Sequence, residues 1–218
     1  MHGNGFKAKA IFFDLDGTIV DSSEAYTEAA RVAFQAIGQT PPPNEVVLEI
    51  PRRLEQGFSI TDITNGEARK FLSVYLKTYY SITRQKTKLI PHVSATLKAL
   101  SEKNKLALIT MRYVPKRAIT KELEFFGIST YFSRVVTARD PFKPKPSPEA
   151  IISCVQALDV EVCDCIIAGD SVNDVRAGKA AGARTVAVLS GLFQSEELAK
   201  EGPDLILNDV TALPKIIK

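Results

Sequence analysis

The sequence contains few of the residues that build metal clusters with sulfur and nitrogen ligands. Its 218 residues include only three cysteines and two histidines. The cysteines are Cys154, Cys163 and Cys165, and they form no CxxC pair. A zinc cluster is therefore not expected, and we expect the three thiols to lie in the protein core.

Long hydrophobic runs are also missing. No stretch approaches the roughly 20 apolar residues that a membrane-spanning helix needs. The first ten residues, MHGNGFKAKA, lack both the apolar run and the small-residue cleavage site of a secretory signal. We therefore expect a cytoplasmic protein that has no membrane partner.

Charge of one sign is not in large excess, because the formal net charge is only +3. Lysines and arginines are scattered and form no stripe with interleaved aromatic residues, so nucleic acid is not an expected partner. Apolar residues make up 45% and charged residues 24% of the chain, which is typical of a globular protein with a full core. Small anionic ligands remain possible, and both a monomer and a homodimer stay open.

Short, apolar, β-branched runs recur along the chain and are separated by segments with helical periodicity. Runs of this kind are typical of strands that are buried on both faces. They lie at residues 10–16, 105–110, 134–138, 165–170, 185–190 and 204–209. The alternation predicts an α/β fold, with a Rossmann-like open parallel sheet and helices on both faces.

One interval is too long for a single crossover helix. Residues 21–88 contain three amphipathic helical patterns and no strand pattern. The patterns span about 21–37, 44–56 and 67–80. We therefore expect a small α-helical domain at 21–88, inserted into a core domain made of 1–20 and 89–218.

Acidic residues follow two of the predicted strands. Asp14 and Asp16 end the first strand, and Asp170 and Asp174 follow the run CIIAG. The carboxyl ends of parallel strands meet at one edge of the sheet, so these carboxylates are expected to converge. Four acids at one point repel one another unless a cation lies between them, and oxygen ligands favour Mg²⁺.

Two other strand ends supply groups that suit a phosphate. Thr110 ends the run ALIT and is followed by Met111 and Arg112. Lys143 and Lys145 lie on a proline-rich loop, RDPFKPKPSP, ahead of a predicted helix. We select Lys143 because it begins the Lys-Pro-x-Pro pattern. A hydroxyl, an ammonium and a metal together describe a phosphate site.

These motifs resemble those of the haloacid dehalogenase superfamily. The segments that carry the resemblance are DLDGT (14–18), Thr110 after its strand, KPKP (143–146) and GDSVND (169–174). A helical insert after the first motif is similar to the helical-cap subclass, which includes phosphoglycolate phosphatases and β-phosphoglucomutases. The resemblance covers nearly the whole chain.

The resemblance implies a role for each matching residue. Asp14 would be the nucleophile that forms an aspartyl-phosphate, and Asp16 the general acid and base. Thr110 and Lys143 would hold the phosphoryl group, and Gly17 would let the backbone pass close to it. The metal site would comprise Asp14, Asp16 through its main-chain carbonyl, Asp170 and Asp174.

Further residues are candidates for substrate contact. Thr18 completes the first motif, and Met111 and Arg112 depart from the small residue or asparagine that the family often has there. Arg52, with Arg53 beside it, lies where the resemblance places residues of the cap that face the substrate. We expect Arg52 to recognise the non-phosphate end, for instance a carboxylate, although a solvated helix face would explain it equally well.

The function expected from these features is a Mg²⁺-dependent phosphatase acting on a small phosphorylated metabolite, with phosphoglycolate-like substrates first. A phosphosugar mutase shares the same core motifs and stays open. A non-enzymatic receiver that only accepts a phosphoryl group on an aspartate is a third hypothesis, and the helical insert argues against it.

Overall fold

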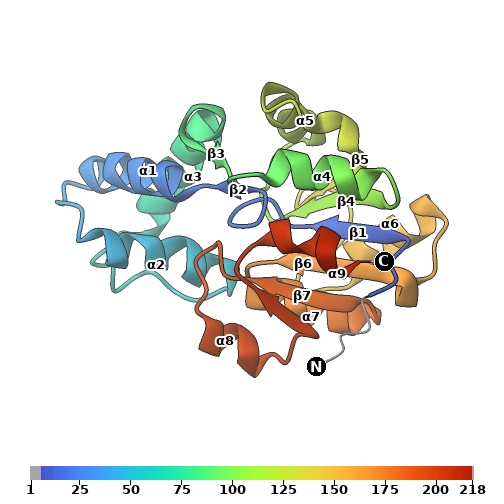
Figure 1. The fold of residues 1–218 in the computed structure, drawn as a ribbon. Helices are drawn as coiled ribbons and strands as arrows, with labels where there is room; N and C mark the ends of the chain where they lie inside the picture. The colour runs from blue at the N-terminus through green and yellow to red at the C-terminus, as the bar shows by residue number, and fades with distance from the viewer. Residues whose placement is uncertain (1–5, 218) are drawn as a thin grey trace. The chain divides into compact units, whose positions relative to one another are not determined.

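The core of the protein is built on a parallel sheet. A computed structural model describes residues 6–217, and within that range six strands form one sheet in the order β5–β4–β1–β6–β7–β8 (Figure 1). All neighbouring strands in it run parallel. The strands are β1 (Ala10–Phe13), β4 (Lys105–Thr110), β5 (Phe132–Thr137), β6 (Cys165–Gly169), β7 (Arg184–Val188) and β8 (Leu205–Leu207). The predicted Rossmann-like open parallel sheet is confirmed.

Alternating side chains of the central strand β1 supply both faces of the sheet. Ile11 and Phe13 belong to one hydrophobic cluster, whereas Ala10 and Phe12 belong to another. The first cluster includes residues of α4 (Val93–Ser101), α5 (Lys116–Phe125) and α9 (Leu213–Ile216). The second includes residues of α6 (Glu149–Leu158) and α7 (Val172–Ala181). Each face of the sheet is therefore covered by helices, which explains why the strands read as continuous apolar runs.

The remaining core elements are short. Leu198 of α8 (Ser195–Lys200) packs with residues of α7 and β7 in a smaller hydrophobic cluster. Single 3₁₀ turns lie at η1 (Ser129–Tyr131), η2 (Val162–Asp164) and η3 (Val210–Ala212). In the described part of the chain, 6–217, no helix is long and apolar enough to cross a membrane.

The chain divides into two compact units, Met1–Val20 with Leu89–Lys218 and Asp21–Lys88. Two short strands, β2 (Val20–Asp21) and β3 (Lys88–Leu89), pair with each other where the chain passes between the units. The second unit contains three helices, α1 (Ser23–Ala36), α2 (Asn44–Glu55) and α3 (Ala68–Lys86). That these units act as a core domain and a cap domain stays a proposal.

The inserted unit has a hydrophobic core of its own. Four buried alanines along α1 leave room for the aromatic side chains of Phe71, Tyr75 and Tyr79 on α3. The spacing of these aromatic residues by four places them on one helix face. Thr83 continues the same buried face, and α3 extends to Lys86, beyond the end near Tyr80 that the sequence pattern predicts.

The three cysteines differ in their surroundings. Cys154 on α6 and Cys165 on β6 are fully buried, as expected. The expectation is wrong for Cys163, which is exposed in the turn η2 that precedes β6. Burial raises the pKa of Cys154 to about 11 and that of Cys165 to about 12. Both thiols therefore stay protonated at neutral pH, and the thiolate is the reactive form.

We predict that one thiol of the folded protein reacts quickly with a disulfide reagent near neutral pH. That thiol is Cys163. Cys154 and Cys165 should react only after denaturant is added, because their raised pKa values keep the thiolate fraction low and their burial blocks the reagent. The measurement is the time course of labelling, followed by mass spectrometry. A Cys163→Ser variant should lose the rapid phase, and rapid labelling of all three cysteines would contradict the prediction.

Candidate active site

The first acidic residue of the site is fixed by the centre of the sheet. Asp14 follows β1 directly, and its main-chain N–H donates to the carbonyl oxygen of Ala168 on β6 at 2.9 Å. This hydrogen bond continues the β1–β6 ladder by one residue. Asp14 is only 7% exposed, so its carboxylate lies at the carboxyl edge of the sheet with little access to water.

A tight turn after Asp14 brings the next motif against β6. Gly17 has a φ of +78°, and a Cβ atom there would lie 2.5 Å from the Asp170 carboxylate. Only glycine accepts this combination of backbone conformation and close approach. The neighbouring Thr18 hydroxyl donates to Asp170 Oδ1 at 3.2 Å. The first motif therefore also holds an acid of the fourth motif in place.

Asp174 is positioned by the start of α7. Ser171 caps this helix, and its side-chain oxygen accepts from the main-chain N–H of Asp174 at 3.3 Å. In return, Asp174 Oδ2 accepts from the Ser171 N–H at 3.2 Å. This reciprocal capping box leaves the second carboxylate oxygen free to face the site. Gly169 is required beside it, because a Cβ atom there would lie 2.0 Å from the Asp174 side chain.

Three of the four predicted acids come together. Asp14, Asp170 and Asp174 are all buried, and each offers an oxygen within 4.8 Å of the oxygens offered by the other two. The parallel arrangement of β1 and β6 explains this convergence, since both strands end at the same edge of the sheet.

The ammonium group in the site belongs to Lys145. Its Nζ atom donates to Asp14 Oδ1 and to Asp174 Oδ1, each at 2.6 Å, and to the Ile109 carbonyl oxygen at 3.1 Å. These three acceptors match the three protons of an ammonium group. Lys145 is only 2% exposed, which is compatible with a charge because carboxylates surround it.

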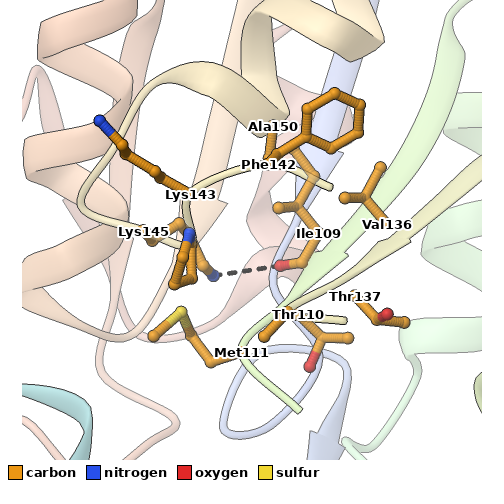
Figure 2. A pocket seen from close by; sticks show the side chains of 11 residues that line it. Ile109, Thr110, Met111, Val136, Thr137, Phe142, Lys143, Lys145 and Ala150 are labelled. Carbon is orange, nitrogen blue, oxygen red and sulfur yellow. Dashed lines mark hydrogen bonds between the residues drawn. The ribbon is translucent and has the colours of Figure 1, made fainter. Parts of the chain in front are cut away.

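The structure does not place Lys143, which the Lys-Pro-x-Pro pattern selected, next to the acids. The Lys143 side chain is 81% exposed, and its Nζ lies 3.8 Å from Glu149 at the start of α6. Figure 2 shows Lys143 pointing away from Ile109, while the Lys145 ammonium reaches the Ile109 carbonyl. The Lys143 main-chain N–H also donates to Glu149 at 2.9 Å, so this part of the loop turns toward the helix and not toward the acids.

Thr110 and Met111 lie beside Lys145. Together with residues at the end of β5 they line one small pocket, which Figure 2 shows from close by. Thr110 is 3% exposed, and its hydroxyl oxygen accepts from the main-chain N–H of Arg112 at 3.2 Å. The hydroxyl proton of Thr110 can therefore still be donated to another acceptor.

The fourth predicted acid, Asp16, turns its carboxylate toward Arg112. Arg112 Nε and Nη2 lie 2.8 Å and 2.6 Å from its two oxygens. The Asp16 side chain is thus outside the carboxylate triad, and a role as metal ligand through its main-chain carbonyl stays a prediction. Arg112 is buried between protein carboxylates, whereas the sequence suggested that it contacts substrate.

Three consecutive residues that the sequence interpretation missed also contact the site. Ser190, just after β7, donates its hydroxyl to the Gly17 carbonyl oxygen at 2.7 Å. A Cβ atom at Gly191 would lie 1.8 Å from Asp170, and the Leu192 N–H donates to Asp170 Oδ2 at 3.2 Å. A Ser-Gly pair one residue after the end of a buried strand is the sequence signal that could have indicated this loop.

Arg52 lies on α2 of the inserted unit. It forms an ion pair with Glu49, one helical turn away. The neighbouring Arg53 pairs with Asp62 at 2.7 Å and so ties the helix to the loop that follows it. Recognition of substrate by Arg52 stays a prediction.

The chemistry of the donor set fits a hard divalent cation. Three buried carboxylates face one ammonium group, which leaves an excess of two negative charges if all are ionised. All available ligand atoms in this triad are oxygens, the type that Mg²⁺ prefers. Asp170 accepts hydrogen bonds from Thr18 and Leu192, which help to orient its carboxylate toward the other two acids.

Comparisons of the sequence with known proteins show its family. The sequence model of the haloacid dehalogenase-like hydrolases matches residues 11–188. A phosphoglycolate phosphatase of Vibrio parahaemolyticus is 29% identical over 220 residues, which cover 96% of this chain and 96% of that protein. A phosphoglycolate phosphatase of Pseudomonas fluorescens is 28% identical over 215 residues, covering 94% of this chain and 78% of that protein.

A solved structure supports the fold. A haloacid dehalogenase-like hydrolase from Streptococcus pneumoniae aligns with a TM-score of 0.79 and 22% identity, and the alignment covers 93% of this chain and 95% of that one. At this identity the likeness concerns the fold alone.

We predict that Lys145 and Lys143 contribute very differently to stability. Lys145→Met leaves Asp14 and Asp174 buried without their ammonium partner and should lower the free energy of unfolding by about 3–5 kcal/mol. Lys143→Met changes an exposed side chain and should stay within about 0.5 kcal/mol of the wild type. The measurement is urea unfolding in the presence of a chelator. Equal effects of the two substitutions would contradict the assignment of Lys145 to the site.

Proposed function

Because the chain belongs to the haloacid dehalogenase-like hydrolase family, we propose that it is a Mg²⁺-dependent phosphatase. Its substrate would be a small phosphorylated metabolite of the phosphoglycolate type, the substrate class in the names of the Vibrio and Pseudomonas relatives. The observation that carries the proposal is the convergence of Asp14, Asp170 and Asp174 with Lys145 at the carboxyl edge of the sheet.

Asp14 is the nucleophile in this proposal. One of its carboxylate oxygens attacks phosphorus, the bond from phosphorus to the ester oxygen breaks, and an aspartyl-phosphate forms. Lys145 already contacts Asp14 Oδ1, so its ammonium is placed to offset the negative charge of an incoming phosphoryl group. Thr110 donates its hydroxyl to the same group, and Gly17 allows the main chain to approach it.

Asp16 is the general acid and base in this proposal. It gives a proton to the leaving oxygen as the ester bond breaks, and it later takes one from the water that attacks the aspartyl-phosphate. That attack releases inorganic phosphate and regenerates Asp14. One carboxyl group thus serves as acid in the first step and as base in the second.

The carboxylates of Asp14, Asp170 and Asp174 would hold the metal, together with the main-chain carbonyl of Asp16. Mg²⁺, when bound, neutralises charge on the phosphoryl oxygens and on the carboxylates around it. Thr18, Ser171 and Leu192 keep the acids oriented through the hydrogen bonds described above. Catalysis in this proposal therefore rests mainly on positioning and on charge stabilisation.

We predict that Asp14→Asn abolishes phosphate release. The amide has nearly the same shape and can still accept a hydrogen bond from Lys145, so the fold should persist, but it is not a nucleophile. The measurement is inorganic phosphate released from a panel of phosphorylated metabolites and from an aryl phosphate, with Mg²⁺ and after its removal by a chelator. Asp164→Asn, which removes only a surface ion pair with Lys9, is the control and should keep wild-type activity. Undiminished turnover by Asp14→Asn would overturn the proposal.

The same assay separates the alternatives. Free phosphate from the wild type favours a phosphatase, whereas an isomerised sugar phosphate without phosphate release favours a mutase. More than one phosphate released per protein chain excludes a receiver that is only phosphorylated once.

The inserted unit, residues 21–88, would act as a cap that admits the substrate and then excludes water. We predict that Arg52→Ala raises KM for a substrate with a carboxylate more than KM for a neutral aryl phosphate, because the guanidinium would pair with the carboxylate. The measurement is steady-state kinetics with both substrates. Arg31→Ala removes a surface pair with Glu28 on α1 and is the matched control in the same unit. Equal effects of Arg52→Ala on the two KM values would contradict substrate recognition by Arg52.

A further inference from the structure

A largely buried row of alternating charges begins at Asp16, two residues after Asp14 of the carboxylate triad. The Arg112 guanidinium contacts both oxygens of Asp16, at 2.8 Å and 2.6 Å, and its remaining nitrogen, Nη1, lies 2.7 Å from Glu122 Oε2. Arg112 and Glu122 are each only 4% exposed. All three guanidinium nitrogens are therefore engaged by carboxylates of the protein itself.

The position of Glu122 indicates that this row is built into the core. Glu122 lies on the buried face of α5, where Ile119 and Leu123 belong to the hydrophobic cluster on one side of the sheet. A carboxylate on such a face loses its hydration, and this cost requires a compensating charge. Arg112 supplies that charge from the loop after β4. The guanidinium is thus held by Glu122, on a helix whose apolar residues belong to the core.

We propose that Arg112 is a positioning residue that fixes the orientation of the Asp16 carboxylate, and that Glu122 holds Arg112 in place for this task. The proposal rests on the proposed function, in which Asp16 transfers protons to and from the reacting oxygens. A bidentate contact fixes the plane of a carboxylate as well as its location. Proton transfer depends steeply on such geometry, because a displacement of about 1 Å can cost roughly a hundredfold in rate.

Arginine is needed for this role, and lysine is not equivalent. A guanidinium presents its donors in a rigid planar fork and can face two carboxylates at once, whereas an ammonium group is a single point of charge on a flexible chain. Lysine at position 112 would keep the positive charge and most of the length. It would lose the two-point contact with Asp16 that sets the orientation.

The test compares Arg112→Lys with the wild type on two substrates. One is an aryl phosphate with a good leaving group, and the other is the alkyl phosphate that releases phosphate fastest in the metabolite screen. We expect kcat/KM for the alkyl phosphate to fall at least tenfold, and kcat/KM for the aryl phosphate to fall much less, because a basic leaving oxygen depends more on a well-placed proton donor. Glu122→Gln should give the same pattern with a smaller loss.

This pattern distinguishes positioning from other roles of Arg112. A loss that is equal for both substrates would indicate general damage to the fold, and a rise in KM alone would indicate direct substrate binding; either result overturns the proposal. Thermal unfolding of each variant shows whether it is folded at the assay temperature. Arg117→Lys and Glu124→Gln, both exposed on α5, are the matched controls and should behave as wild type.

A double-mutant cycle provides the second measurement. If Arg112 acts through Asp16, then Arg112→Lys should have almost no further effect on kcat/KM for the alkyl phosphate once Asp16 is changed to Asn. Independent, multiplying losses in the cycle would overturn the proposal. Failure of the proposed function itself looks different, since the wild type would then release no phosphate from any substrate.

Discussion

Mutual repulsion among buried carboxylates is the constraint on which the site depends. Asp14, Asp170 and Asp174 share a space with little water, where like charges interact strongly. Lys145 offsets part of this repulsion from one side, and hydrogen bonds from Thr18 and other groups stabilise the remaining oxygens. The negative charge that remains is what makes the pocket attractive to a divalent cation.

The architecture of the sheet could be predicted from the sequence. Strands that are covered by helices on both faces must be apolar throughout, so runs such as AIFF and CIIAG could be recognised without knowing their partners. Because all the strands run parallel, their ends meet at one edge, and the convergence of Asp14 with Asp170 followed from topology alone. The long insert could be recognised because residues 21–88 contain helical periodicity only.

Side-chain directions in loops and on helices were harder to predict. Lys143 was selected on a Lys-Pro-x-Pro pattern, but Lys145 begins one as well, KPSP, so the pattern does not separate the two residues. The direction of each side chain depends on contacts such as that of Lys143 with Glu149, which no periodic pattern encodes. Asp16 was placed with the other acids because charge clustering says nothing about a nearby arginine. The burial of Glu122 could have been inferred from the sequence, since it lies on the apolar face of its helix, where an acid requires a partner of opposite charge.

The central position of β1 has a consequence for biosynthesis. This strand is made first, yet its neighbours are β4, which begins at Lys105, and β6, which begins at Cys165. A nascent chain therefore carries these four apolar residues without β4 until about half of the polypeptide is made, and without β6 for longer still. The insert can already assemble its own aromatic cluster during this time. During this delay an apolar strand stays exposed, and exposed strands of this kind are where a nascent chain is prone to aggregate.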